Sequence, residues 1–125
     1  MLKWKFFRSK WTALVWFTIM TILFLLPGSA FPQDNWLSRI NFDKWVHIGL
    51  FGGLVFLWLS AFGRTDNSRM ILIVTAILYG VAVEYVQQQW VANRSFDVYD
   101  IIADAGGVFL GWVVWWWVYK KNKPL

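Results

Sequence analysis

The sequence predicts an all-α integral membrane protein, a four-helix bundle with both termini in the cytoplasm. Three features predict this fold class: the composition, the length of the apolar runs and the placement of the charges. Of the 125 residues, 58% are hydrophobic and 15% are charged, whereas soluble domains carry about 25% charged residues. We expect residues 1–125 to form a single membrane domain.

Four apolar runs approach the length of about 20 helical residues that the hydrocarbon core of a bilayer requires. They cover roughly residues 11–26, 45–62, 70–90 and 99–119. The first run follows basic residues and precedes Gly28-Ser29-Ala30, so it also resembles a secretory signal peptide. It exceeds the length of about 7–15 residues that is usual for the apolar part of such peptides, and we expect a retained span.

The basic residues predict the orientation of these spans. The N-terminal segment, the 64–69 connection and the tail carry nine Lys and Arg residues against one acid. The opposite side carries three basic and six acidic residues. Because loops rich in Lys and Arg stay in the cytoplasm, we expect both termini there.

The composition also excludes several classes of function. The chain has no cysteine, which rules out a disulfide framework, an iron–sulfur cluster and a cysteine nucleophile. A net charge of +5 would fit a nucleic-acid partner, but the basic residues lie at the ends of different apolar runs and not on one face. We therefore expect no nucleic-acid partner.

Small residues four positions apart predict where the helices approach each other closely. Such pairs occur in the last three runs: Gly49 and Gly53, Ala76 and Gly80, and Gly107 and Gly111. Polar residues adjoin these pairs along each helix, so we expect the polar faces to point into the bundle.

Ionisable residues within the apolar runs indicate the candidate site. A charged group near the centre of a membrane helix costs on the order of 3 kcal/mol, so such groups usually face a cavity or one another. At about 1.5 Å per residue, His47, Glu84 and Asp104 lie at roughly 3, 9 and 7 Å below the aromatic residues that flank their spans. Three helices thus bring polar groups to one level in the outer leaflet.

Helical spacing adds further polar residues to the same faces. Together they form a set of nine: Asp43, Lys44, His47, Glu84, Gln87, Arg94, Asp97, Asp100 and Asp104. Arg94 precedes the fourth run, and its planar guanidinium can hold one carboxylate while presenting donors outward. We expect these residues to line a polar pocket that opens to the outer surface.

At these positions the chain resembles the VanZ-like family of membrane proteins. The string Phe42-Asp43-Lys44-Trp45-Val46-His47 is similar to the family's DKxxH signature, and Glu84-x-x-Gln87 to its ExxQ pair. The stretch RSFDVYDIIADAGGVFLG, from Arg94 to Gly111, is similar to its R…D…D…G…G pattern. Order and spacing agree over about residues 40–112; Asp104 departs from the pattern, in which Asn is common.

The resemblance implies a small multi-pass protein of the bacterial cytoplasmic membrane that serves the cell envelope. The family's namesake is associated with low-level resistance to the glycopeptide antibiotic teicoplanin. The resemblance does not imply a particular reaction.

One hypothesis is an enzyme that acts on an envelope lipid or a lipid-linked precursor. His47 would be its general base and Glu84 an acid or proton acceptor, while Lys44 and Arg94 would anchor phosphate. The catalytic residues would be His47, Glu84, Asp100 and Asp104, and the substrate-binding residues Asp43, Lys44, Gln87, Arg94 and Asp97. No cofactor is expected except a divalent metal, for which His47, Glu84, Asp100 and Asp104 offer ligands suited to magnesium or manganese.

Three alternatives remain open at the level of sequence. A binding or exclusion protein would hold the headgroup without making or breaking a bond. A small permease subunit would use the intramembrane carboxylates to carry protons. In a purely structural protein, the polar residues would pair with one another and lock the helices together.

Overall fold

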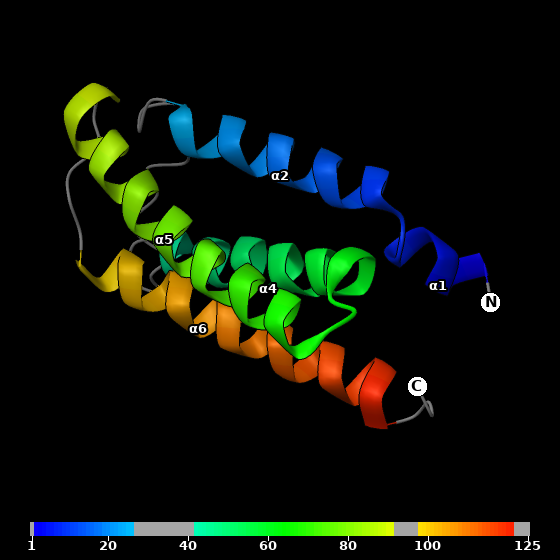
Figure 1. Ribbon diagram of the computed structural model, residues 1–125. Helices are drawn as coiled ribbons and strands as arrows, with labels where there is room; N and C mark the ends of the chain where they lie inside the picture. The colour runs from blue at the N-terminus through cyan, green and yellow to red at the C-terminus, as the bar shows by residue number, and fades with distance from the viewer. Residues whose placement is uncertain (1, 27–41, 92–97, 122–125) are drawn as a thin grey trace.

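The computed structural model describes residues 2–26, 42–91 and 98–121, and all regular structure in these ranges is helical (Figure 1). The helices are α1 (Leu2–Phe7), α2 (Lys10–Leu25), α4 (Phe42–Phe62), α5 (Asp66–Trp90), α6 (Val98–Trp115) and a final π-helical turn, η2 (Trp116–Lys121). The side chains of residues 2–4, 42–43 and 120–121 are not described. No strand occurs in the described ranges, which confirms the predicted all-α class.

Three of the helices are long and apolar enough to cross a membrane. They are Lys44–Phe62, Asp66–Trp90 and, with α6 and η2 continuous, Val98–Tyr119. Helix α2 is apolar but shorter, because its 16 residues extend only about 24 Å at 1.5 Å per residue. It ends at Leu25, and the backbone of its C-cap residue Leu26 is extended (ψ 146°), as expected for a residue that precedes proline.

Helix α5 begins four residues earlier than the apolar run predicted. Thr65 is its N-cap, and the side chains of Thr65 and Ser68 each accept a hydrogen bond from the other's backbone N–H, which forms a capping box. Arg69 holds the same turn by donating to the carbonyl of Gly63 (2.9 Å) and pairing with Asp66 (2.7 Å). These polar residues extend the helix beyond the region that hydropathy alone would include.

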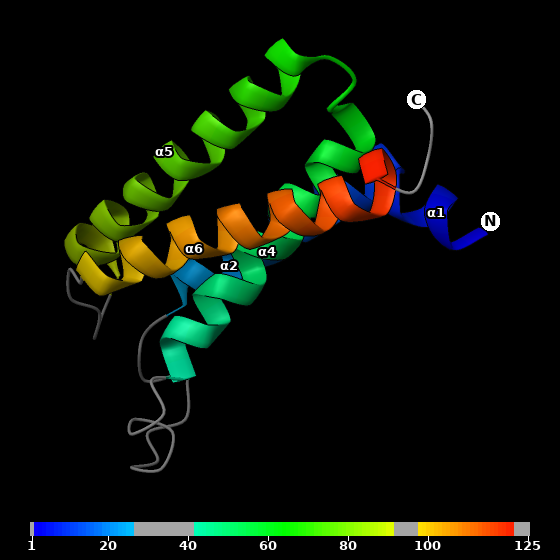
Figure 2. The same cartoon turned by 90° about the horizontal axis from the view of Figure 1, so that it is seen from below.

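The helices run back and forth, so the molecule has two distinct ends. Helix α1, the α4–α5 turn and η2 lie at one end, and the last turns of α2 and α5 with the first turns of α4 and α6 lie at the other (Figure 1). Helix α4 crosses α6 obliquely, whereas the end of α5 lies beside the start of α6 and the two helices diverge from there (Figure 2). We call the end that holds the start of α4 and α6 the site end.

Glycines set the close contact between α4 and α6. A Cβ atom on Gly107 would lie 2.5 Å from the carbonyl oxygen of Ile48, and one on Gly111 would collide with the carbonyl oxygen of Gly52. The predicted role of Gly107 and Gly111 is therefore confirmed. The same prediction for Gly49 is wrong: among the described residues a Cβ there would meet nothing within 4 Å, because the face of α4 that approaches α6 carries Ile48, Phe51 and Gly52.

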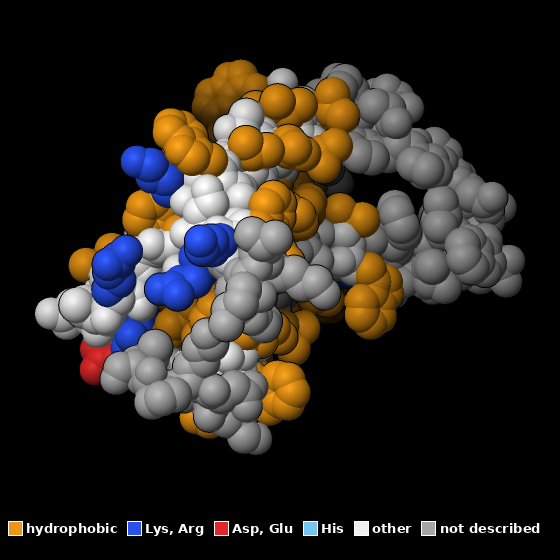
Figure 3. All heavy atoms as spheres, turned by 90° about the vertical axis from the view of Figure 1, so that its right-hand side faces the viewer, with side chains coloured by type: hydrophobic (Ala, Val, Ile, Leu, Met, Phe, Trp, Pro, Cys, Tyr) orange, Lys and Arg blue, Asp and Glu red, His pale blue; other side chains and the backbone are white. Residues whose placement is uncertain are grey.

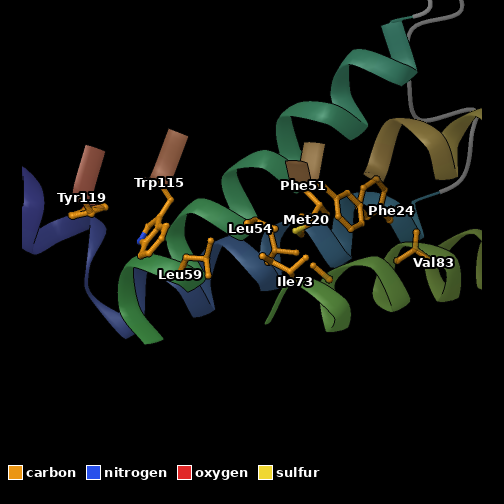
Figure 4. Packing of buried hydrophobic residues seen from close by; sticks show 12 residues of the cluster. Met20, Phe24, Phe51, Leu54, Leu59, Ile73, Val83, Trp115 and Tyr119 are labelled. Carbon is orange, nitrogen blue, oxygen red and sulfur yellow. The ribbon is translucent and has the colours of Figure 1, made fainter. Parts of the chain in front are cut away.

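Helix α2 packs against α4 and α5 through aromatic side chains. The indole of Trp16 lies on Gly53, where a Cβ would collide with it, and its Nε1 donates to the carbonyl of Leu50 (2.9 Å). Further along α2, Met20 and Phe24 are buried against Phe51 of α4 (Figure 4). The core thus extends along α4 and reaches the site end.

Candidate functional site

Five polar side chains of the predicted set are buried at the site end. They come from three helices: His47 from α4, Glu84 and Gln87 from α5, and Asp100 and Asp104 from α6. Lys44, one turn before His47, is partly exposed. The side chain of Asp43, together with Arg94 and Asp97, lies outside the described residues, so their predicted roles stay predictions.

A short polar contact in this group joins α4 to α6. Nδ1 of His47 lies 2.6 Å from Oδ1 of Asp104, and the two residues are 3% and 2% exposed. An ionised carboxylate can only accept, so Nδ1 is the donor and, in a neutral ring, Nε2 carries the free lone pair. Asp104 therefore selects the tautomer of His47 and the orientation of its ring.

The free nitrogen of His47 faces further carboxylates. Nε2 lies 3.8 Å from Oδ2 of Asp100, whose other oxygen, Oδ1, forms an ion pair with Nζ of Lys44 at 2.8 Å. Glu84, which is 0% exposed, completes the group from α5. One ligand atom from each of His47, Glu84 and Asp100 lies within 4.8 Å of the other two.

Gly80 provides the space that Asp104 occupies. A Cβ on Gly80 would lie 2.9 Å from Oδ2 of Asp104 and 3.1 Å from its Cβ. Oδ2 is buried and has no hydrogen-bond partner among the described residues. The predicted small residue in α5 thus serves the site directly, because any larger side chain would displace the carboxylate that orients His47.

Helix α2 contributes Phe24 to the surroundings of the site. The sequence predicts no site residue in this helix. The ring of Phe24 lies 4.8 Å from the ring of His47, centroid to centroid. Its backbone carbonyl accepts a hydrogen bond from Nε2 of Gln87 at 2.9 Å. Nothing in the sequence identified Phe24, since it is one apolar residue within an apolar run.

An apolar cavity of about 250 Å³ lies between α2, α4 and α5. Its lining residues are Phe17, Leu54, Val55, Trp58, Leu72, Thr75, Ala76 and Tyr79. Tyr79 also packs on Phe51 (5.7 Å between centroids), and Phe51 packs on Phe24 (5.8 Å). A continuous set of rings therefore leads from the cavity to His47.

Apolar helices of membrane-spanning length, with a histidine–carboxylate centre buried between three of them, define an integral membrane protein. Residues 2–119 match the family model described as VanZ/LLP1, so the chain belongs to this family and the predicted resemblance is confirmed. Comparison with curated proteins and comparison with solved structures each returned no match.

Proposed function

We propose that this protein binds a cell-envelope lipid or lipid-linked precursor in the outer leaflet of the bacterial cytoplasmic membrane and modifies its headgroup. The observation that carries the proposal is the buried contact of His47 with Asp104, with Glu84 and Asp100 beside it. Burying ionised groups costs on the order of several kcal/mol for each ion. Apolar residues in the same positions often stabilise a fold to the same extent or more. The cost is therefore better explained by a ligand than by stability.

The charge distribution supports the proposed orientation, with four spans and both termini in the cytoplasm. Four exposed basic side chains lie on α1, between α1 and α2, at the start of α2 and in the α4–α5 turn. In this order they are Lys5, Arg8, Lys10 and Arg64. Lys and Arg side chains gather at this end of the molecule (Figure 3). Positive charge marks the cytoplasmic side of short loops, so the site end belongs to the outer leaflet.

The surroundings of the site favour a lipid over a water-soluble ligand. Polar groups gather beside Lys44. The apolar cavity lies further along the bundle, and the contacts of the Tyr79, Phe51 and Phe24 rings connect it to His47. A molecule with a polar headgroup and a long apolar chain satisfies both environments. Lys44, with Arg94 as its expected companion, would anchor a headgroup phosphate.

The proposal can be tested with purified protein in nanodiscs. Wild type, His47→Ala and the control Asp66→Asn, which alters an exposed carboxylate at the opposite end, would be incubated with envelope lipid extract. Mass spectrometry should then show lipid species consumed and formed by wild type and the control only. Lipid that is retained but unaltered would overturn modification and support a binding protein, and solute flux into sealed vesicles without lipid binding would support a permease.

A further inference from the structure

We propose that His47, Glu84 and Asp100 bind one divalent cation, and that Asp104 is the positioning residue for the histidine ligand. The inference rests on the proposed function, because the cation would lie at the site where the headgroup binds. Of the two roles that the sequence predicts for His47, general base and metal ligand, it selects the second, since one lone pair at Nε2 cannot serve both purposes. It also changes Asp104 from a predicted ligand to the residue that positions His47.

The three ligand atoms lie close to the separation that a shared cation requires. They lie within 4.8 Å of one another, whereas magnesium–oxygen distances of about 2.0–2.1 Å place ligands on opposite sides of the ion about 4.2 Å apart. The side chains would therefore close on the ion by about 0.6 Å or less. Nε2 of His47 and Oδ2 of Asp100 are closer, at 3.8 Å. Each ligand comes from a different helix, so a cation would tie α4, α5 and α6 together.

The surrounding contacts prepare two of the ligands. Asp104 accepts from Nδ1 of His47 at 2.6 Å, and a carboxylate in this position is the usual outer partner of a metal-binding histidine. Lys44 binds Oδ1 of Asp100 at 2.8 Å, so Oδ2 is the oxygen that faces the histidine. Lys44 is itself partly exposed (21% of its side chain), which places the group near the surface at the site end.

The carboxylates of the described residues would attract a cation. Three carboxylates meet at the centre, from Glu84, Asp100 and Asp104, while Lys44 is the one lysine or arginine that the described part of the chain places there. A cation held by these carboxylates would add a further anchor for the headgroup phosphate that Lys44 and Arg94 are proposed to bind. A divalent ion would offset negative charge at the centre and could bind carboxylate and phosphate oxygens at once.

The ligand chemistry favours a hard or borderline ion. Two carboxylates and one imidazole suit manganese or magnesium, and the absence of cysteine from the sequence leaves no thiolate for a softer ion. We therefore choose Mn²⁺ as the probe, because it can be observed directly by electron paramagnetic resonance.

The test is a Mn²⁺ titration of chelator-treated full-length protein in nanodiscs. We expect saturable binding of one Mn²⁺ per chain, and pulsed spectra that show coupling to one imidazole nitrogen. Glu84→Gln and Asp100→Asn should each weaken binding at least tenfold, and Asp104→Ala about 10–100-fold; Asp66→Asn should match wild type. The coupling of Mn²⁺ to an imidazole nitrogen is measured on the wild-type protein. This measurement therefore tests the site even if a variant fails to fold.

Either of two results of the titration would contradict the proposed cation site: wild-type protein that shows no saturable Mn²⁺ binding, or bound Mn²⁺ whose spectrum shows no nitrogen coupling. Lipid modification that persists in excess chelator would overturn it as well, and would leave the proposed function intact. Stoichiometric Mn²⁺ binding by a protein that neither binds nor alters envelope lipid would instead support the cation and reject the proposed function.

Discussion

Nδ1 of His47 lies 2.6 Å from Oδ1 of Asp104, and this contact lies about one turn from the close approach of Gly107 to the backbone of α4. The glycines that allow the approach, Gly52 and Gly107, follow the two site residues in the chain by five and three positions. Helix packing and site geometry therefore depend on the same contact. A change that separates the helices should also disturb the histidine.

The glycine contact can be tested by adding one methyl group. Gly111→Ala should destabilise the protein by about 1–3 kcal/mol, because its Cβ would collide with the carbonyl of Gly52. Gly106→Ala is the matched control, since its Cβ would meet nothing within 4 Å. Thermal unfolding in detergent measures the difference, and equal melting temperatures for the two variants would contradict the packing described.

Gly80→Ala should impair function more than stability. Its Cβ would lie 2.9 Å from Oδ2 of Asp104, so the carboxylate must move and the histidine loses its fixed orientation. We expect envelope-lipid modification to fall at least tenfold while the protein still unfolds cooperatively. Full activity in Gly80→Ala would show that the position of Asp104 does not matter.

Gln87 should hold the last turn of α2 against the bundle. Gln87→Ala removes the donor to the Phe24 carbonyl (2.9 Å) and leaves a buried acceptor unpaired, at a cost of about 1–3 kcal/mol. Gln88→Ala, at the exposed neighbouring position, is the control. Limited proteolysis of folded protein should cut near α2 faster in Gln87→Ala than in the control; identical digestion would mean that this hydrogen bond is dispensable.

The proposed orientation can be read from single thiols, because the sequence contains no cysteine. A membrane-impermeant maleimide should label Gln89→Cys in intact cells, since this exposed residue lies at the site end. It should label Asn67→Cys, in the first turn of α5, only after the membrane is permeabilised. The reverse pattern would place the site on the cytoplasmic side and reject an outer-leaflet substrate.

Much of the fold follows from local pattern. Apolar runs place the helices to within a few residues, because a membrane span must satisfy its backbone hydrogen bonds internally. The earlier start of α5 was missed since its capping residues, Thr65 and Ser68, are polar. The rotation of α4 about its own axis was less predictable from the sequence. Gly49 and Gly52 lie less than one turn apart, and only the packing of α4 on α6 decides which of them faces α6.

The sequence predicts which polar residues lie near one another but not how they pair. Depth within the spans predicted that His47, Glu84 and Asp104 lie at one level, helical spacing added Asp100, and the structure buries all four at the site end. Which carboxylate binds the histidine depends on the crossing of α4 and α6, and the neighbouring Phe24 depends on how α2 docks. Neither the contact of His47 with Asp104 nor that of His47 with Phe24 can be predicted from a sequence pattern.

The most direct test replaces the central pair by apolar residues of similar size. In the double variant His47→Leu with Asp104→Leu, a buried polar contact becomes hydrophobic packing, which often leaves stability unchanged or raises it. The account predicts an unfolding temperature at or above that of wild type together with complete loss of envelope-lipid modification, both measured on the same nanodisc preparation. A folded double variant that still modifies the lipid would contradict the account.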